Sequence, residues 1–303
     1  MPMKIGVSLT SAYPAGDPRA GARMMIERAA AARRANLDSL FVGDHHATPG
    51  PYYQNVPIMA RLLAEWSDKP AGCLFLLPLW NPVLLAEQVG TLAAIAQGRF
   101  IVQVGLGDDE AQFLAMGAAL KTRPSAFEES LAAIRRLLAG ETVTATGRFT
   151  FENARVALRP AEPVEVWIGA TANVAIDRAA RLGDAWLGSP GLIPAAAAAK
   201  NAIYRERCVV HGRVPTAIAI RRDVYVGQSK ADAAATLEQA VARGYRGFDP
   251  AALVAGDIEQ VVAQFQALAG MGYTDVIVRH FTNDHAKVLA SFARLGEVRR
   301  ALS

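Results

Sequence analysis

Three of the five histidines lie within a few residues after apolar segments of strand length. His45 and His46 come after residues 39–42, and His280 comes after residues 275–278. An imidazole changes its charge near neutral pH, so each of the three could transfer a proton or ligate a metal. For any single one of them, a structural role is an equally weighted alternative. Asp44 precedes the pair, where it would orient an imidazole or, as the favoured alternative, cap the loop.

A phosphate-binding turn is the second chemical signal. Gly169, Ala170 and Thr171 lie between an apolar segment, 164–168, and a helix expected at about 173–182. The free amides at a helix N-terminus bind anions, and the Thr171 hydroxyl would add a donor. The alternative is that Thr171 is an ordinary helix N-cap. Gly105 and Gly107 follow another apolar segment and would let a cofactor approach the backbone, although such glycines also mark turns.

Two aromatic residues are further candidates for the site. Trp80 follows the apolar segment 72–79, and Tyr52 lies in the loop after the histidine pair. Both residues would shape a substrate pocket, and packing in the core is the alternative for each.

Residues 72–107 show which elements position these side chains. Gly72 to Leu79 is an almost unbroken apolar run, and Asn81-Pro82 supplies an N-cap followed by the residue best suited to the first helical position. The helix should end at Gly98, after which residues 100–104 are again apolar. The segment is therefore a strand, helix and strand, which predicts a parallel sheet.

The same alternation extends along the chain and predicts one α/β domain over residues 1–303, a TIM (β/α)8 barrel with insertions. The eight expected strands are 4–9, 39–42, 72–79, 100–104, 164–168, 185–187, 217–226 and 275–278. A capping box at Ser125–Glu128 is expected to begin a helix, and residues 142–158 are expected to form an inserted hairpin. In such barrels, chemistry collects at the carboxyl ends of the strands, where all of the candidates above lie.

Composition limits the class of protein. The chain has 303 residues, of which 52% are hydrophobic and 20% charged, which suits a large core. Its net charge is only +4 and the basic residues occur in scattered pairs, so no nucleic-acid-binding stripe is expected. Two cysteines predict core thiols in a reducing compartment rather than a disulfide framework. With neither a signal-peptide pattern nor an apolar span of membrane length, we expect a soluble, cytoplasmic protein without a membrane partner.

Several short motifs occur along the chain in a fixed order: Pro82, Ala86-Glu87, Gly98-Arg99-Phe100 and Gly105-Leu106-Gly107, together with residues 38–46 near the start and 164–186 later in the chain. In these elements the chain resembles the luciferase-like flavin monooxygenase family, which includes bacterial luciferase and oxidoreductases that depend on coenzyme F420. The resemblance therefore spans nearly the whole chain.

The resemblance implies roles for several residues. His45 would face the flavin ring as an acid, base or hydrogen-bond donor, with His46 as a weaker second candidate. Cys73-Leu74 lies where the family often has a non-prolyl cis peptide behind the flavin; an ordinary buried strand is the alternative. Beside these roles, the positions at strand ends predict that Gly105, Gly107 and the turn 169–171 bind the cofactor and that His280 binds the substrate.

The cofactor stays open between reduced FMN and F420. The luciferases proper have an arginine that contacts the FMN phosphate where this chain has Leu106, and the segment 105–109 with Phe113 and Gly117 is closer to the F420-dependent branch. FMN would support oxygen activation and insertion into a small organic substrate, whereas F420 would support hydride transfer.

Two other functions remain as alternatives. One is a metal-dependent hydrolase with His45, His46 and His280 as ligands, which the spacing does not favour because adjacent histidines project in different directions. The other is a non-catalytic member that only binds flavin. The candidate partners are a small-molecule substrate, a separate flavin reductase and a second copy of the chain; the oligomeric state, the substrate and the electron donor stay open.

Overall fold

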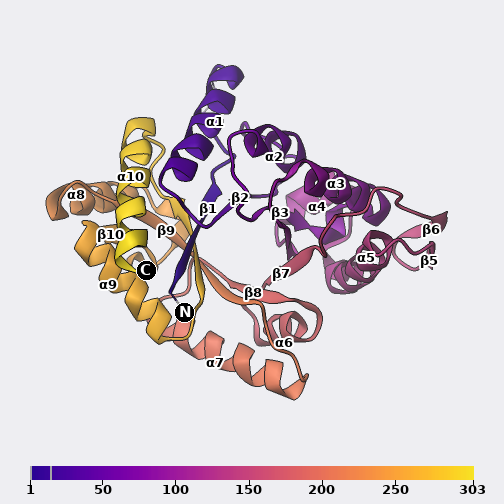
Figure 1. The fold of residues 1–303 in the computed structure, drawn as a ribbon. Helices are drawn as coiled ribbons and strands as arrows, with labels where there is room; N and C mark the ends of the chain where they lie inside the picture. The colour runs from indigo at the N-terminus through magenta and orange to yellow at the C-terminus, as the bar shows by residue number, and fades with distance from the viewer. Residues whose placement is uncertain (1, 14–15) are drawn as a thin grey trace. The chain divides into compact units, whose positions relative to one another are not determined.

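The computed structural model describes residues 2–13 and 16–303, in which helices and strands alternate along the chain (Figure 1). The eight predicted strands are all present. They are β1 (Lys4–Leu9), β2 (Ser39–Val42), β3 (Ala71–Leu76), β4 (Phe100–Gly105), β7 (Glu165–Gly169), β8 (Ala185–Gly188), β9 (Ala217–Val226) and β11 (Asp275–His280). The α-helices are α1 (Pro18–Arg34), α2 (Asn55–Leu63), α3 (Pro82–Ile95), α4 (Glu110–Ala115), α5 (Arg123–Leu138), α6 (Asn173–Leu182), α7 (Pro194–Val210), α8 (Lys230–Ala242), α9 (Ile258–Gly270) and α10 (His285–Ala301).

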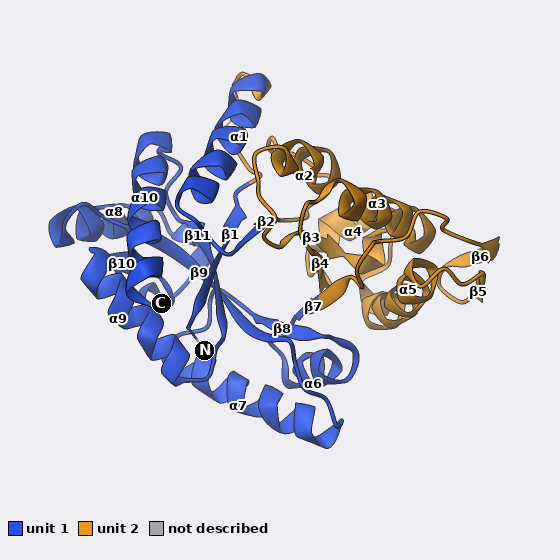
Figure 2. Cartoon of the chain, in the orientation of Figure 1, with its two compact units in different colours: residues 1–10, 19–41, 167–303 blue, residues 11–18, 42–166 orange. Residues whose placement is uncertain are grey.

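The chain forms two compact units (Figure 2). Unit 1 contains residues 1–10, 19–41 and 167–303, and unit 2 contains residues 11–18 and 42–166. The expectation of a single domain over 1–303 stays a prediction.

Unit 1 holds most of the parallel sheet. Strands β7, β8, β9, β11 and β1 are neighbours in that order, and β2 follows β1. The register pairs Ala185 with Ala217, Asp275 with Ala219, and Lys4 with Asp275, so every one of these pairs is parallel. Gly6 is required within this sheet, because a Cβ at that position would lie 2.1 Å from Oγ of Ser39.

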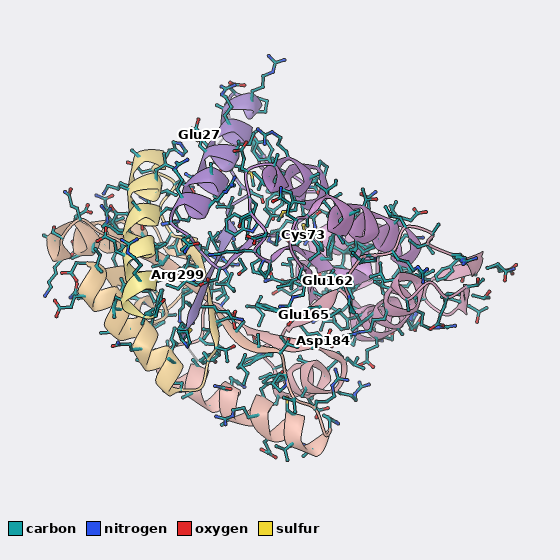
Figure 3. All side chains as sticks on the ribbon, in the orientation of Figure 1. Glu27, Cys73, Glu162, Glu165, Asp184 and Arg299 are labelled. Carbon is teal, nitrogen blue, oxygen red and sulfur yellow. The ribbon has the colours of Figure 1, made fainter. Side chains whose placement is uncertain are left out.

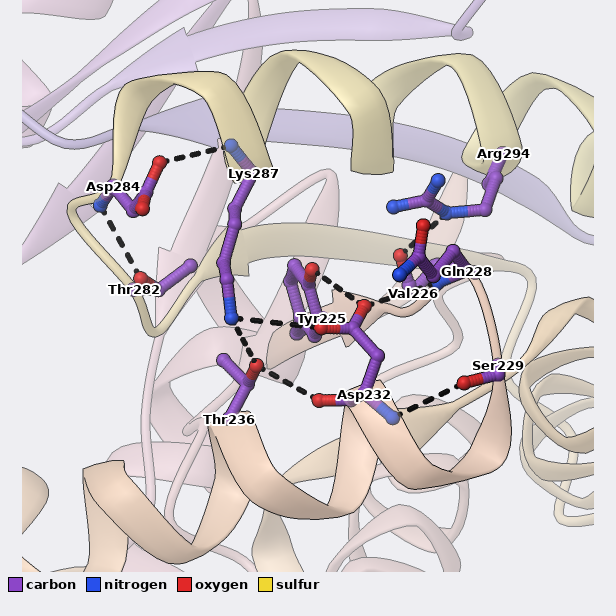
Figure 4. Close-up of polar contacts among 10 residues, drawn as sticks. All are labelled: Tyr225, Val226, Gln228, Ser229, Asp232, Thr236, Thr282, Asp284, Lys287 and Arg294. Carbon is purple, nitrogen blue, oxygen red and sulfur yellow. Dashed lines mark hydrogen bonds and ion pairs between the residues drawn. The ribbon is translucent and has the colours of Figure 1, made fainter.

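Polar contacts connect helix α10 and helix α8 to each other and to neighbouring strands and loops of unit 1. Lys287 of α10 places its Nζ 2.9 Å from the Thr236 hydroxyl and 3.5 Å from a carboxylate oxygen of Asp232, both on α8 (Figure 4). The Tyr225 hydroxyl donates to the other oxygen of Asp232 at 2.9 Å. On the same helix α10, Arg299, labelled in Figure 3, forms a two-pronged ion pair with Asp38, which precedes β2.

Unit 2 contains the parallel pair β3 and β4, in which Ala71 pairs with Phe100. The predicted hairpin is also present, as the antiparallel strands β5 (Val143–Thr146) and β6 (Thr150–Ala154). A small core of Ala86, Leu137, Val143 and Val156 lies among α3, α5 and the hairpin segment.

Local details differ from the sequence predictions. The third strand ends at Leu76 rather than Leu79, because residues Leu77–Leu79 turn into a short 3₁₀ helix around Pro78. Helix α5 begins at Arg123, two residues before the expected capping box, and Ser125 donates its hydroxyl to Thr122 instead of capping. The short strand β10 (Val254–Gly256), which is not among the eight predicted strands, pairs with the end of β9.

In the described part of the chain, no helix is both long enough and apolar enough to span a membrane.

Candidate functional site

The loop after β2 is organised by the carboxylate of Asp44. This side chain is fully buried, and its Oδ2 accepts hydrogen bonds from the backbone N–H of Leu76 and from Nε1 of Trp80, both at 2.8 Å. Oδ1 lies 3.2 Å from Nε2 of His46, an electrostatic contact rather than a hydrogen bond. Asp44 therefore fixes the ends of β2 and β3 together with Trp80, which is more than the loop cap favoured from the sequence.

The two adjacent histidines have different surroundings. His46 is half-buried, and its ring packs edge-on against Trp80 with the ring centroids 5.4 Å apart. Its backbone N–H donates to the buried Gln112 side chain. His45 is exposed, and its ring meets Tyr52 edge-on with centroids 5.4 Å apart. Its carbonyl oxygen accepts from the Gln54 side chain at 3.0 Å. His45 is thus the histidine of the pair that is accessible to a ligand, and Tyr52 lies beside it.

On β3, neighbouring residues face opposite sides of the sheet, as in any strand. Cys73, labelled in Figure 3, is completely buried, with its Sγ 3.9 Å from the Asn55 carbonyl of α2. Burial, and secondarily the charge of Asp44, raises the pKa of this thiol well above its usual value. Leu74 points to the other face and is half-exposed. No peptide bond in the described residues is cis, so the ordinary-strand alternative for Cys73-Leu74 is the one observed.

The end of β4 presents a glycine-lined surface next to an amide. A Cβ at Gly105 would lie 3.4 Å from Leu76, on the face that Leu74 shares, and Gly107 has a left-handed φ of 72°. Gln103, two residues before Gly105 and therefore on the same face, is buried, and its Nε2 has no hydrogen-bond partner among the described residues. An unpaired buried donor is costly, so this amide is a candidate ligand contact that the sequence analysis missed.

A cavity of about 450 Å³ lies on the opposite, helix-facing side of β4, between Val102 and Val104 and the α5 residues Leu131 and Ile134. None of the predicted site residues lines it.

In unit 1, the turn after β7 leads into the N-terminus of α6. Ala170 is held by Trp186, whose Nε1 donates to its carbonyl at 2.9 Å, and Thr171 is exposed. The N-cap of α6 is Ala172, which offers no side-chain acceptor, so Thr171 is not the N-cap that the alternative required. Lys200 of α7 lies at this terminus, with Nζ 2.7 Å from Oδ1 of Asn173. Uncapped amides and a lysine together favour an anion.

His280 at the end of β11 lies on the helix-facing side of the sheet. Its ring packs against Phe292 of α10, with centroids 4.6 Å apart, and it is almost fully buried. Burial, with the charges of Arg28 and Arg294, lowers its pKa to about 3, so it is neutral at physiological pH. The structure therefore does not place His280 with the turn 169–171, the other predicted ligand-binding segment of unit 1.

Arg279, the neighbour of His280, points to the opposite face and donates to the Thr10 hydroxyl at 2.9 Å. The register places Arg221 and Asp223 of β9 on this same face, since Ile277 pairs with Arg221 and Arg279 with Asp223. The sequence analysis missed this group, although the run 221–223 is a charged interruption in an otherwise apolar strand.

No group of three histidine, cysteine, aspartate or glutamate side chains that could hold a metal ion occurs in residues 2–13 and 16–303. In particular, the three histidines of the hydrolase alternative do not form one.

Comparison with known proteins decides the family. The sequence profile of the luciferase-like monooxygenases matches residues 3–270. The chain belongs to this family. Among curated relatives of this luciferase-like chain, an F420-dependent glucose-6-phosphate dehydrogenase from Intrasporangium calvum is 23% identical over 93% of this chain and 96% of the relative. The enzyme of the same name from Beutenbergia cavernae is 30% identical over 59% of this chain and 56% of the relative.

Solved structures of similar fold include the monooxygenase RslO1 from Streptomyces bottropensis, with a TM-score of 0.86, 20% identity and coverage of 97% of this chain and 98% of that one. An F420-dependent secondary alcohol dehydrogenase, in complex with an F420-acetone adduct, has a TM-score of 0.81 at 18% identity over both full chains. The oxygenating constituent of 3,6-diketocamphane monooxygenase from Pseudomonas putida, in complex with FMN, has a TM-score of 0.83 at 17% identity and 98% coverage of both chains. The predicted luciferase-like (β/α)8 barrel and the predicted class, an oxidoreductase, are confirmed.

Proposed function

We propose that this luciferase-like oxidoreductase uses coenzyme F420 and exchanges a hydride with a small organic substrate. The observation that carries the choice of cofactor is the match to the Intrasporangium calvum relative. That F420-dependent enzyme is covered over 96% of its length. Leu106 supports it, since the arginine that the resemblance associates with the FMN phosphate is missing there.

The residues of unit 2 fit such a cofactor. The orphaned Nε2 of Gln103 would donate to an acceptor of the ring system, which would remove the cost of its unpaired burial. Gly105, with no side chain, admits a flat ring beside Leu74. Cys73 would contribute through its backbone, because its thiol points toward α2.

In unit 1, the cofactor's phosphate would bind at the N-terminus of α6. The amides after Ala172, the Thr171 hydroxyl and Lys200 supply donors and positive charge there, with Gly169 and Ala170 forming the turn.

When bound, F420 accepts or supplies a hydride, which leaves the protein to manage the accompanying proton. We assign that proton to His45: it is removed from a substrate hydroxyl as the hydride leaves the adjacent carbon, or returned to the oxygen in the reverse direction. Tyr52, which touches His45, and Trp80, which Asp44 holds in place, would shape the substrate pocket.

The test is a fluorescence titration of the purified chain with F420 and with FMN, each oxidised and reduced. We expect F420 to bind at least tenfold more tightly than FMN, and Gln103→Leu, which removes the amide at similar volume, to weaken F420 binding. Tighter binding of FMN, or binding of neither cofactor, would overturn the proposal.

Other assignments accompany this proposal. The two free cysteines, both buried, support a reducing, cytoplasmic location. A separate reductase would be a partner only if the titration favoured FMN. Sedimentation of the purified chain would show whether a second copy is a partner.

A further inference from the structure

The carboxyl end of β9 holds more positive charge than its one carboxylate neutralises. Asp223 is completely buried. Its Oδ1 accepts from Nε and Nη2 of Arg221 at 3.2 and 3.1 Å, and its Oδ2 accepts from the Tyr245 hydroxyl at 2.8 Å and from Arg246 at 3.5 Å. Arg279 lies opposite Asp223 in the register and projects from the same face, so three guanidinium groups and one carboxylate share this face, which leaves a charge of 3 − 1 = +2.

The excess charge is partly shielded from solvent. The side chain of Arg221 is only 17% exposed, whereas that of Arg246 is 38% exposed. Burial lowers the pKa of Arg221 to about 10 despite Asp223, and the charges of Arg279 and Arg246 add to the decrease. Arg279 makes no ion pair within the described residues; its recorded hydrogen bond is to Thr10. Partly buried cations at close range repel one another, and a second anion would offset the positive charge that Asp223 leaves.

The backbone conformation of Arg246 is strained. Arg246 has a φ of 51°, the left-handed conformation that a side chain disfavours, between Gly244 and Gly247, which are left-handed as well. Arg221 and Tyr245 donate to Asp223 at shorter distances than Arg246, whose contact is the longest of these at 3.5 Å. Strain of this kind collects at ligand-binding sites.

We propose that Arg221, Arg246 and Arg279 bind an oxyanion group, a carboxylate or a phosphate, carried by the substrate; the assignment to the substrate rests on the proposed oxidoreductase function. Guanidinium groups match both anions because their N–H donors form a planar fork. The turn proposed for the cofactor's phosphate lies after β7, which β8 separates from β9. The two anion sites are therefore distinct.

The experiment measures binding of inorganic phosphate and of acetate to the cofactor-free full chain, from the rise in Tm at constant ionic strength with chloride as the reference. Arg246→Gly removes one guanidinium and also relieves the left-handed strain, so the variant should fold at least as well as the parent. Arg279→Gln removes a second one. Arg300→Gln, at an exposed position on α10, is the matched control.

We expect the parent and Arg300→Gln to bind at least one of the two anions equally, and Arg246→Gly and Arg279→Gln to bind it about tenfold or more weakly, because each loses a charged hydrogen bond. A response to phosphate alone assigns a phosphorylated substrate, and a response to acetate alone a carboxylate. The same measurements are repeated with Thr171→Glu added to each variant. The added carboxylate repels phosphate from the N-terminus of α6, so any remaining response comes from the arginine site. Equal binding by all variants, or none by the parent, would overturn the site.

An F420 titration of the same variants separates the two proposals. If phosphate binding depends on the arginines but F420 does not bind, the proposed function fails and the anion site stands. If F420 binds but the arginine variants bind the anions as the parent does, the anion site fails and the proposed function stands.

Discussion

Replacing Asp44 tests whether one buried carboxylate organises the loop that carries both histidines. In Asp44→Ala, the buried N–H of Leu76 loses its partner, which costs about 1–3 kcal/mol, and the charged hydrogen bond to Trp80, worth about 1.5–3 kcal/mol, is also lost. We expect the free energy of unfolding to fall by about 3–5 kcal/mol.

The matched variant is Asp44→Asn. An amide oxygen has two lone pairs and can accept from both Leu76 and Trp80, so the variant loses the charge but leaves neither of these donors unpaired, and its amide nitrogen takes the place of Oδ1 beside Nε2 of His46. We expect it to lose only about 1–2 kcal/mol.

The assay is a urea titration of both variants at pH 7, followed by far-UV circular dichroism, with hydrogen exchange of the Leu76 amide as the local readout. Exchange should speed up strongly in the alanine variant and little in the asparagine variant. The reasoning fails if the alanine variant lies within about 1 kcal/mol of the parent, or if the two variants are equally destabilised.

Three further changes test other parts of the structure. Thr171→Glu should weaken cofactor binding by charge repulsion at the α6 terminus while the chain stays folded; unchanged affinity in the fluorescence titration would remove that site. His45→Ala should lower turnover by about 100-fold or more with little change in cofactor affinity, and full activity at saturating substrate and cofactor would exclude its proton-transfer role. His280 is held neutral by burial and by Arg28 and Arg294, with Asp223 opposing, so its folded pKa of about 3 lies below the unfolded value of 6.5. The unfolded state then binds the extra proton first, stability falls as the pH drops from 6.5 toward 3, and His280→Gln should flatten the pH dependence of the unfolding free energy over that range.

The sequence by itself determined the elements, because the signals that set them are local. The βαβ unit from β3 to β4 was predictable from two apolar runs and one cap: Asn81 accepts from the N–H groups of Val83 and Leu84, as its position before Pro82 required. The strand end at Leu76 was missed because apolar residues continue past it, and only the proline among them marked the change.

The direction in which each side chain points was decided by the tertiary structure. Arg279 and His280 are adjacent in the sequence, and only the register with β9 shows that the arginine shares a face with Arg221 and Asp223 while the histidine packs on α10. One residue of difference in a strand reverses the face, and residue type does not fix it. Arg246 reaches Asp223 from 23 residues further along the chain, through a left-handed turn. Local sequence patterns carry no information on such a contact, because it exists only once the chain has folded.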